Sequence, residues 1–273
     1  MEKSTLHGMP CIFCESDGPL TVEHAYPKWI RRALYATGPT KMWRGSDHRH
    51  IRTDTGLAVV LRKAVCSGCN SGWLASLEDR VNHLLAPALT GNHVVLTPES
   101  QRVVATWAVG RALVLELAMA GFNKVTYAPT SNCYWLFEHR DDPIPPPGAH
   151  VWLAAVDARL GTADALVAWV KRGWSADVGR EPDRPWAYFM TFSAGYLVVQ
   201  VAGQELETGD DVDPSRVMRP DSLINTVRLI WPARTDLIAW PPPEHLTTDT
   251  MARVASWEGA ETATRRTVRL PHV

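Results

Sequence analysis

The sequence predicts an α+β protein in which helices come before an antiparallel sheet. Hydrophobic residues recur with the helical period up to about residue 140, and with the alternating period of strands after residue 148. The spacing of the cysteines near the N-terminus adds a metal site made by two C-x-x-C pairs. The chain has 273 residues, of which 45% are hydrophobic and 21% are charged. It can therefore bury a sizeable core, in one large domain or in two ordinary ones.

Residues 1–90 are predicted to form the first unit. Pro27 fits the first position of a helix, and Pro87 and Gly91 fit the end of a later one. The expected elements are a strand at 20–22, a helix from Pro27, a polar loop or insertion at 38–56, a strand at 58–61 and a helix over 70–85. The buried stripe of that last helix should be Trp73, Leu74, Leu77, Val81, Leu84 and Leu85.

Residues 91–273 are predicted to form a second α+β region. Thr97 and Pro98 are typical of a helix start, and the helix that they begin is apolar enough to lie in the core. Because no helices separate the later strand candidates, we expect an antiparallel meander. The expected segments are helices within 97–140, a proline-rich linker at 141–148, and a β-rich part at 149–273 with strands at 151–156, 165–169, 186–192, 196–201 and 227–231 and a last helix near 247–257.

Four of the five cysteines form two C-x-x-C pairs that are 51 residues apart. Each pair can grip one metal ion from the same side, and two pairs complete the tetrahedron of sulfurs that is typical of structural zinc. The alternatives are buried reduced cysteines or disulfides. The fifth, Cys133, is most simply a buried apolar residue. The proposed zinc ligands are Cys11, Cys14, Cys66 and Cys69.

An acid–histidine pair, Glu23-His24, lies between the two cysteine pairs, and Asn70 follows the last cysteine directly. Histidine titrates near neutral pH and can deprotonate a water molecule. A carboxylate and an amide oxygen suit a hard ion such as Mg²⁺. Because neighbouring side chains of a strand point to opposite faces, the acid could face the ion while the histidine faces the attacking water. The alternative is a surface acid beside a histidine that serves only packing or solvation.

In this order of motifs, residues 8–85 resemble the HNH (His-Me finger) endonucleases, in the zinc-stapled form found in phage junction-resolving and restriction-type proteins. The resemblance implies a ββα hairpin–helix fold pinned by zinc. It also implies that His24 is the general base of phosphodiester hydrolysis in DNA. Glu23 and Asn70 would hold the catalytic divalent ion, and the four cysteines would hold the structural zinc. A role in restriction or phage defence is a further expectation from the family.

Three features differ from the usual family pattern and motivate a second hypothesis. A glutamate replaces the more usual aspartate before the histidine, 41 residues separate His24 from the second cysteine pair, and the middle asparagine that orients the base is not evident. The chain could then be a non-catalytic zinc-stapled module that binds nucleic acid or protein. In either case, 91–273 is open to self-association or to a partner protein. His48, His50 and His83 are additional ligand candidates, although each is more simply a solvated or packing residue.

Segment 27–63 carries nine basic and two acidic residues, a net charge of +7, although the whole chain has a net charge of −1. A polyanion would need this excess beside the acid–histidine pair, so we expect DNA as the partner. The alternative is an ordinary solvated face. The residues expected to contact phosphates are Lys28, Arg31, Arg32, Arg44, Arg49, Arg52 and Lys63.

The sequence contains no apolar run long enough to cross a membrane, and Met1-Glu2-Lys3-Ser4 does not read as a signal peptide. We therefore expect no membrane partner and a reducing, cytoplasmic location. In that compartment, paired C-x-x-C motifs favour a metal over disulfides.

Overall fold

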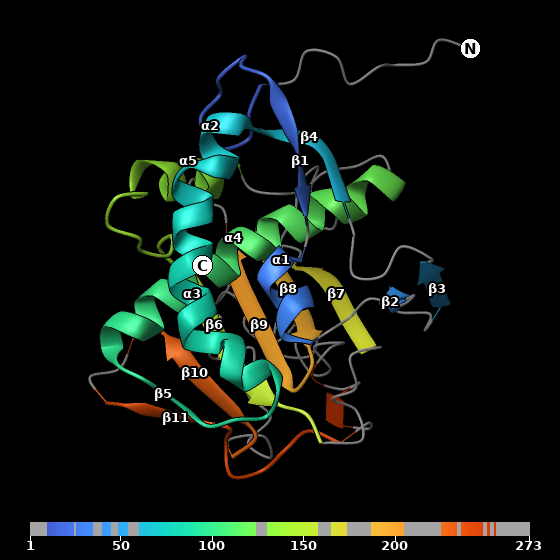
Figure 1. Ribbon diagram of the computed structural model, residues 1–273, viewed down its shortest axis with the longest axis vertical. Helices are drawn as coiled ribbons and strands as arrows, with labels where there is room; N and C mark the ends of the chain where they lie inside the picture. The colour runs from blue at the N-terminus through green and yellow to red at the C-terminus, as the bar shows by residue number, and fades with distance from the viewer. Residues whose placement is uncertain are drawn as a thin grey trace, which may run out of the picture.

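A computed structural model describes residues 10–24, 26–34, 40–44, 49–53, 60–123, 130–157, 165–173, 187–204, 225–233, 236–247, 250–251 and 254. It confirms the α+β class, since helices combine with strands that pair mostly antiparallel (Figure 1). One hydrophobic core extends from Cys11 to Trp240 and contains residues from both predicted regions. The division of the chain at residue 90 stays a prediction.

The N-terminal part is a two-stranded hairpin followed by helices. Strand β1 (Leu20–His24) pairs antiparallel with β4 (Val60–Cys66), and a bulge interrupts the register between Thr21 and Val22. β1 agrees with the strand predicted at 20–22. β4 overlaps the strand predicted at 58–61 at its first two residues and continues into the second cysteine pair, while residues 58 and 59 lie outside the described part. Helix α1 (Lys28–Ala33) begins directly after Pro27, as predicted within one residue.

The predicted loop at 38–56 is wrong, because it contains two strands. β2 (Thr40–Arg44) and β3 (Arg49–Thr53) form an antiparallel hairpin, and β2 also pairs parallel with β7 (Ala165–Gly173). Their sequences are too polar and charged to indicate strands by themselves. Strand formation depends strongly on the neighbouring strands, and here the neighbour comes from far along the chain.

The helix predicted over 70–85 is two helices. α2 (Ser67–Ser71) and α3 (Trp73–Leu89) are separated by Gly72, whose backbone has φ −96° and ψ −113°. A Cβ atom at Gly72 would lie 2.3 Å from the carbonyl oxygen of Gly68, so the break needs glycine. The predicted stripe of α3 is confirmed as buried at four positions and partly buried at Trp73 and Leu84. The buried positions are Leu74, Leu77, Val81 and Leu85.

Helix α3 continues past Pro87, one of the two residues predicted to end it, and stops at Leu89, just before Gly91, the other. The helix ends in two backbone hydrogen bonds: the amide of Gly91 donates to Ala88 at 3.1 Å, and the amide of Asn92 donates to Pro87 at 3.0 Å. Gly91 has φ +85°, the left-handed conformation that this type of helix end requires. A proline near the end removes one donor of the ladder without stopping the helix.

Helix α4 (Pro98–Asn123) is the central core helix that the sequence predicts. It is buried on all sides over 103–115, and it contacts α3, α5 (Thr130–Glu138) and the strands behind it (Figure 1). Its start is capped as predicted, with the amide of Ser100 donating to Oγ1 of Thr97 at 3.2 Å. The proline-rich segment after α5 packs against that helix, where Nε1 of Trp135 donates to the carbonyl of Ile144 at 3.2 Å.

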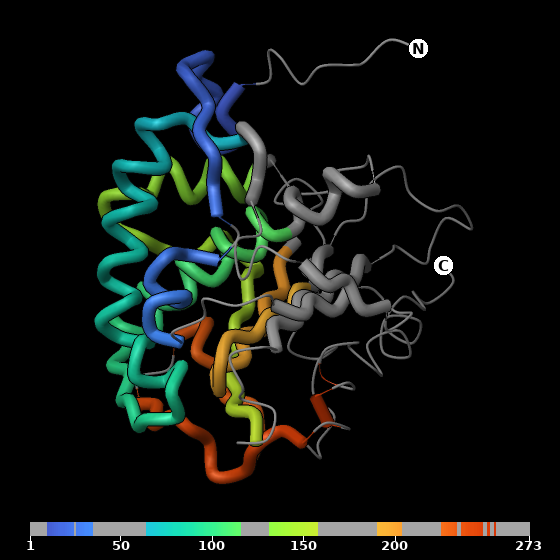
Figure 2. Tube along the Cα trace, turned by 45° about the vertical axis from the view of Figure 1, so that its right-hand side comes forward, coloured from blue at the N-terminus to red at the C-terminus, as the bar shows by residue number. Residues whose placement is uncertain are grey.

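A seven-stranded sheet lies behind α4 (Figure 1), and its five later strands form where the sequence predicts them. In Figure 2, the teal helix α3 lies to one side of the orange strand β9. Only β7, β8 and β9 form the expected meander, because β6 pairs with β9 and β10 instead of β7. The sheet order is β10-β6-β9-β8-β7-β2-β3. The other strands of this sheet are β6 (His150–Ala155), β8 (Ala187–Ala194), β9 (Leu197–Gln204) and β10 (Val227–Trp231). A separate two-stranded sheet consists of β5 (Val94–Leu96) and β11 (Ile238–Trp240).

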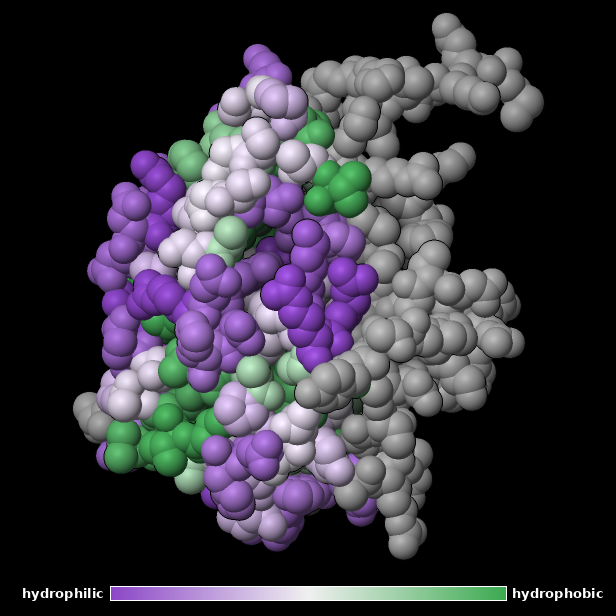
Figure 3. Space-filling view, in the orientation of Figure 1, coloured by the Kyte–Doolittle hydropathy of each residue, from purple (hydrophilic) through white to green (hydrophobic). Residues whose placement is uncertain are grey.

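The second face of the sheet carries a smaller apolar cluster that includes Val198, Leu246 and Val254. Residues 250, 251 and 254 are helical, in agreement with the predicted last helix, whose other residues after 247 lie outside the described part. In the described part of the chain, none of the helices is both long and apolar enough to cross a membrane. Figure 3 shows a largely hydrophilic face with a hydrophobic area at its lower left, where β5 and β11 lie.

Candidate metal centre and candidate active site

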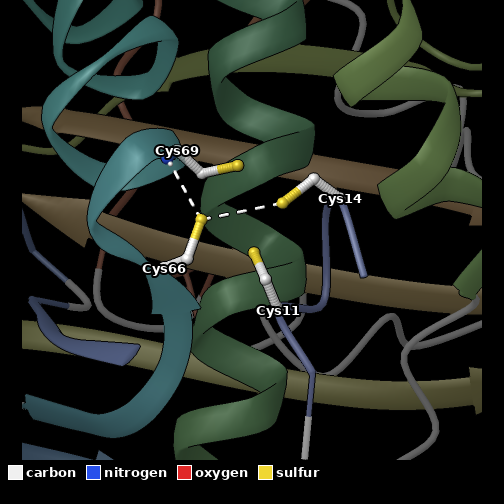
Figure 4. Close-up of side chains that lie close together, drawn as sticks. All are labelled: Cys11, Cys14, Cys66 and Cys69. Atoms are coloured by element: carbon white, nitrogen blue, oxygen red, sulfur yellow. Dashed lines mark hydrogen bonds between the residues drawn. The ribbon is translucent and has the colours of Figure 1, made fainter. Parts of the chain in front are cut away.

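The four cysteines of the two C-x-x-C pairs come together at the open end of the β1–β4 hairpin (Figure 4). Cys11 and Cys14 lie in the turn before β1, Cys66 is the last residue of β4, and Cys69 lies in α2. Their sulfur atoms all lie within 4.8 Å of one another, and the sulfurs of Cys14 and Cys66 are 3.6 Å apart. Zinc with bonds of ~2.3 Å in a tetrahedron sets sulfurs about 3.8 Å apart. The cluster is therefore close enough to bind a metal such as zinc.

Backbone hydrogen bonds hold both C-x-x-C pairs of this cluster in place. The amide of Cys69 donates to the sulfur of Cys66 at 3.4 Å, so that Cys66 caps α2. The first pair is tied to the hairpin by the amide of Ile12, which donates to the carbonyl of Ala64 at 3.0 Å. Beside the cluster, Phe13 and Trp73 pack edge to face with ring centroids 5.3 Å apart. These contacts preorganise the four sulfurs, because each cysteine is placed by backbone bonds or by local packing.

Burial and hydrogen bonds act in opposite directions on the thiols. Burial raises the pKa of Cys11, but backbone hydrogen bonds from Cys66, Cys14 and Phe13 together bring its pKa below the usual value. Burial raises the pKa of Cys69 far above that value, and burial also raises the pKa of Cys14. In a metal-free state the thiols of Cys14 and Cys69 would therefore stay protonated. A bound cation would therefore release protons from this cluster.

Asn70, which follows Cys69 in α2, lies alongside β1. Its Nδ2 donates to Oγ1 of Thr21 at 2.9 Å and to the carbonyl of Val22 at 3.3 Å. Both acceptors come just before Glu23 and His24 in the same strand. The side-chain amide is therefore fixed through its nitrogen, and the carbonyl oxygen is the atom left to act as a ligand.

Glu23 is only 4% exposed and pairs with a buried arginine of α4. Nη1 of Arg111 lies 2.6 Å from Oε1 of Glu23, 3.1 Å from the carbonyl oxygen of His24 and 3.3 Å from Oε1 of Glu78. Burial opposes the charge of Arg111, but Glu78 and Glu23 together raise its pKa. Burial raises the pKa of Glu78, against the attraction of Arg111. Two carboxylates thus surround one guanidinium, directly behind the acid–histidine pair.

Sequence reasoning missed both Arg111 and Glu78. The available signal was that Arg111 is the lone charged residue in the apolar stretch 103–115, where a charge is rarely buried without a partner. The sequence did not indicate which acid would pair with it, since Glu23 lies 88 residues earlier.

His24 ends β1 and is partly exposed. Its Nδ1 lies on the buried side of the ring, without a hydrogen-bond partner in the described structure. Burial lowers the pKa of His24, and the positive charges of Arg31 and Lys28 lower it further, against the opposing effect of Glu23. The imidazole is therefore neutral near neutral pH, the form that can accept a proton.

The predicted phosphate-contacting residues fall into two groups. Lys28 and Arg32 are exposed on α1, and Arg31 is half-buried there, close enough to act on His24. The others lie on strands whose side chains are outside the described structure: Arg44 on β2, Arg49 and Arg52 on β3, and Lys63 on β4.

Of the additional histidines, only His83 has a described side chain, and it is not part of the cysteine cluster. His83 is exposed on α3, the side chain of His50 lies outside the described structure, and so does the whole of His48. Within the described ranges, no second group of three or more His, Cys, Asp and Glu side chains lies close enough to hold a metal. Cys133 is buried in α5, as expected.

No protein-family model, no curated protein sequence and no solved structure matches this chain. The chemistry of the site must therefore carry the functional interpretation. It combines a sulfur cluster suited to a metal with a neutral, partly exposed histidine and an oriented amide, next to cationic side chains of α1.

Proposed function

We propose that the chain is a metal-dependent endonuclease of the HNH type, which hydrolyses phosphodiester bonds in DNA. The observation that carries the proposal is that one scaffold brings the two cysteine pairs, Asn70 and the end of β1 close to one another. The hairpin of β1 and β4, joined to α2 at the cysteine cluster, brings Asn70 alongside the strand that ends at His24. In this proposal, Cys11, Cys14, Cys66 and Cys69 hold a structural zinc ion.

His24 is the general base in this proposal. The lowered pKa keeps the imidazole neutral near pH 7, so that it can take a proton from the attacking water. Lys28, Arg31 and Arg32 lie on the next element and attract the phosphate backbone, with Arg44, Arg49, Arg52 and Lys63 as further contacts.

Glu23 and Asn70 fit a hard divalent ion by donor type, since a carboxylate and an amide oxygen are ligands that Mg²⁺ accepts. Arg111 engages Oε1 of Glu23 and leaves Oε2, while Asn70 is oriented through its nitrogen and leaves Oδ1. One guanidinium between two carboxylates leaves a formal charge of −1, which favours a cation. When bound, such an ion offsets the charge that develops on the leaving oxygen.

A plasmid-nicking assay with and without Mg²⁺ tests the proposal. We expect the wild type to nick supercoiled DNA only with the divalent ion. His24→Ala should lower the rate by about 10²–10⁴-fold, the usual contribution of general base catalysis. His83→Ala removes an exposed histidine of α3 and is the matched control. Equal activity in wild type and His24→Ala would reveal a contaminant and reject the role of His24.

The buried pair of Glu23 and Arg111 favours a second candidate function, a non-catalytic zinc-stapled module that binds nucleic acid or protein. A carboxylate already held by a guanidinium can serve a structural purpose alone. In this case the wild type would bind DNA or a protein partner with the expected zinc content, yet it would not nick plasmid with Mg²⁺, Mn²⁺ or Co²⁺.

A further inference from the structure

Arg111 combines three properties that a purely structural residue does not require. It is 1% exposed, it lies in the middle of the central core helix, and its Nη1 atom reaches two consecutive residues of β1. A buried ion pair is often no more stabilising than apolar side chains of similar volume. The position of the Arg111 contacts says more about the role of this residue than its charge does. These contacts converge on Glu23 and His24, the proposed catalytic pair.

The contacts of Arg111 restrain the backbone that carries the His24 ring. Nη1 holds the side chain of Glu23 at 2.6 Å and the carbonyl oxygen of His24 at 3.1 Å. A strand end is the place where the backbone is least restrained by ladder bonds, and this double contact restrains Glu23 through its side chain and His24 through its carbonyl oxygen. Glu78 of α3 supplies the third oxygen, 3.3 Å away.

The rest of α4 fixes Arg111 itself. One turn earlier, Trp107 packs on Trp29 of α1, with ring centroids 5.8 Å apart, and on Phe192 of β8, with centroids 5.9 Å apart. The guanidinium therefore has a defined position relative to both the C-terminal sheet and the helix that carries Lys28 and Arg31.

We infer that Arg111 is a positioning residue, through which α4 holds Glu23 and the backbone of His24 in the geometry that the cleavage reaction needs. The inference rests on the proposed function. It gives 91–273 a role in the reaction, since the residue that aligns the N-terminal site belongs to that region. Arg111 does not touch DNA in this role, because its side chain is buried.

The experiment compares Arg111→Met with a matched change on the same helix. Met has similar length but makes no hydrogen bonds, so His24 loses its restraint. A misplacement of ~1 Å costs on the order of a hundredfold in rate. We expect kcat for nicking of supercoiled plasmid with Mg²⁺ to fall by about that factor, while KM for DNA and the zinc content stay unchanged. Arg111→Lys keeps the charge and one contact, and it should recover roughly a tenth of the wild-type kcat.

Gln101→Met is the control for a merely structural effect. Gln101 is fully buried and donates to the carbonyls of Leu96 at 3.1 Å and Asp236 at 2.8 Å, about 15 Å along α4 from Arg111. This variant should unfold at a lower temperature, yet it should keep kcat at an assay temperature well below its unfolding midpoint.

The outcomes separate this inference from the proposed function. A wild type that does not nick DNA would overturn both. A nicking wild type with unchanged kcat in folded Arg111→Met, or an equal loss in Gln101→Met, would overturn the inference alone. If Arg111→Met does not fold, Arg111→Lys decides: reduced kcat at constant KM supports the positioning role, and wild-type kcat rejects it.

Discussion

Cys66→Ser separates metal binding from helix capping, because serine can still cap α2 but cannot supply a thiolate to a metal. The sulfur of Cys66 lies 3.6 Å from that of Cys14 and also accepts the amide of Cys69 at the start of α2. Serine is a good helix cap, so the variant should retain the start of α2. It should lose a soft thiolate ligand that zinc prefers.

The expected loss of unfolding free energy follows if the four sulfur ligands contribute equally to zinc binding. Structural zinc contributes ~10–16 kcal/mol in small zinc-dependent units, which is about 2.5–4 kcal/mol for each sulfur. For a chain of this size, 1 kcal/mol corresponds to roughly 2–4 °C in the unfolding midpoint. We therefore expect Cys66→Ser to unfold roughly 5–16 °C lower, and Cys66→Ala to lose about 1 kcal/mol more through the missing cap.

Two measurements check this prediction in freshly purified, reduced protein. Elemental analysis should find one zinc ion per wild-type chain, and a chelator should lower the unfolding midpoint of the wild type more than that of Cys66→Ser. Amide hydrogen exchange should rise in β1, β4 and α2 before it rises in β6 and β9. Wild-type protein without zinc, or a variant that keeps both zinc and the wild-type midpoint, would refute the reasoning.

Three further perturbations address binding, metal response and packing. Reversing the charge of Arg31 and Arg32 in a His24→Ala background should weaken DNA binding. It should also reduce the slope of the log binding constant against log salt concentration by about two, since each phosphate contact contributes ~0.9. An unchanged slope would mean that these arginines form an ordinary solvated face. Asn70→Ala should raise the Mg²⁺ concentration needed for half-maximal nicking, with zinc content unchanged, and a wild-type Mg²⁺ titration would contradict its role as a ligand. Gly195→Ala should lower the free energy of unfolding, measured in urea, by about 3 kcal/mol. The backbone at Gly195 has φ +56°, and the new Cβ would lie 2.1 Å from the carbonyl oxygen of Leu89. An unchanged unfolding midpoint would show that the turn adapts to alanine.

Local signals were sufficient to predict much of the secondary structure. The cap at Thr97, the apolar faces of the helices and the alternation after residue 148 each act within a few residues, so the sequence displays them directly. The cysteine spacing was equally informative, because two C-x-x-C turns able to hold one metal ion between them must lie side by side, as the four sulfurs do.

Long-range pairing could not be predicted in the same way. β2 is a strand because β7 lies beside it, and nothing in its own residues indicates that partner. The break at Gly72 depends on the position of the Gly68 carbonyl, which only the folded chain defines.

The contacts within the candidate site could not be predicted from the sequence either. Glu23 and His24 were recognisable as a pair, but the burial of Glu23 against Arg111 depends on how α4 crosses behind the hairpin. The metal role of Glu23 therefore has to be tested together with its ion pair, and could not have been judged from residue types alone.

The parallel pairing of β2 with β7 has a consequence for synthesis on the ribosome. About 120 residues separate the two strands in the chain, and translation at ~5–20 residues per second needs roughly 6–24 s to cover that distance. During this interval, the β2–β3 hairpin has emerged without the sheet edge that it later joins. The seven-stranded sheet can therefore be completed only after most of the chain has been made.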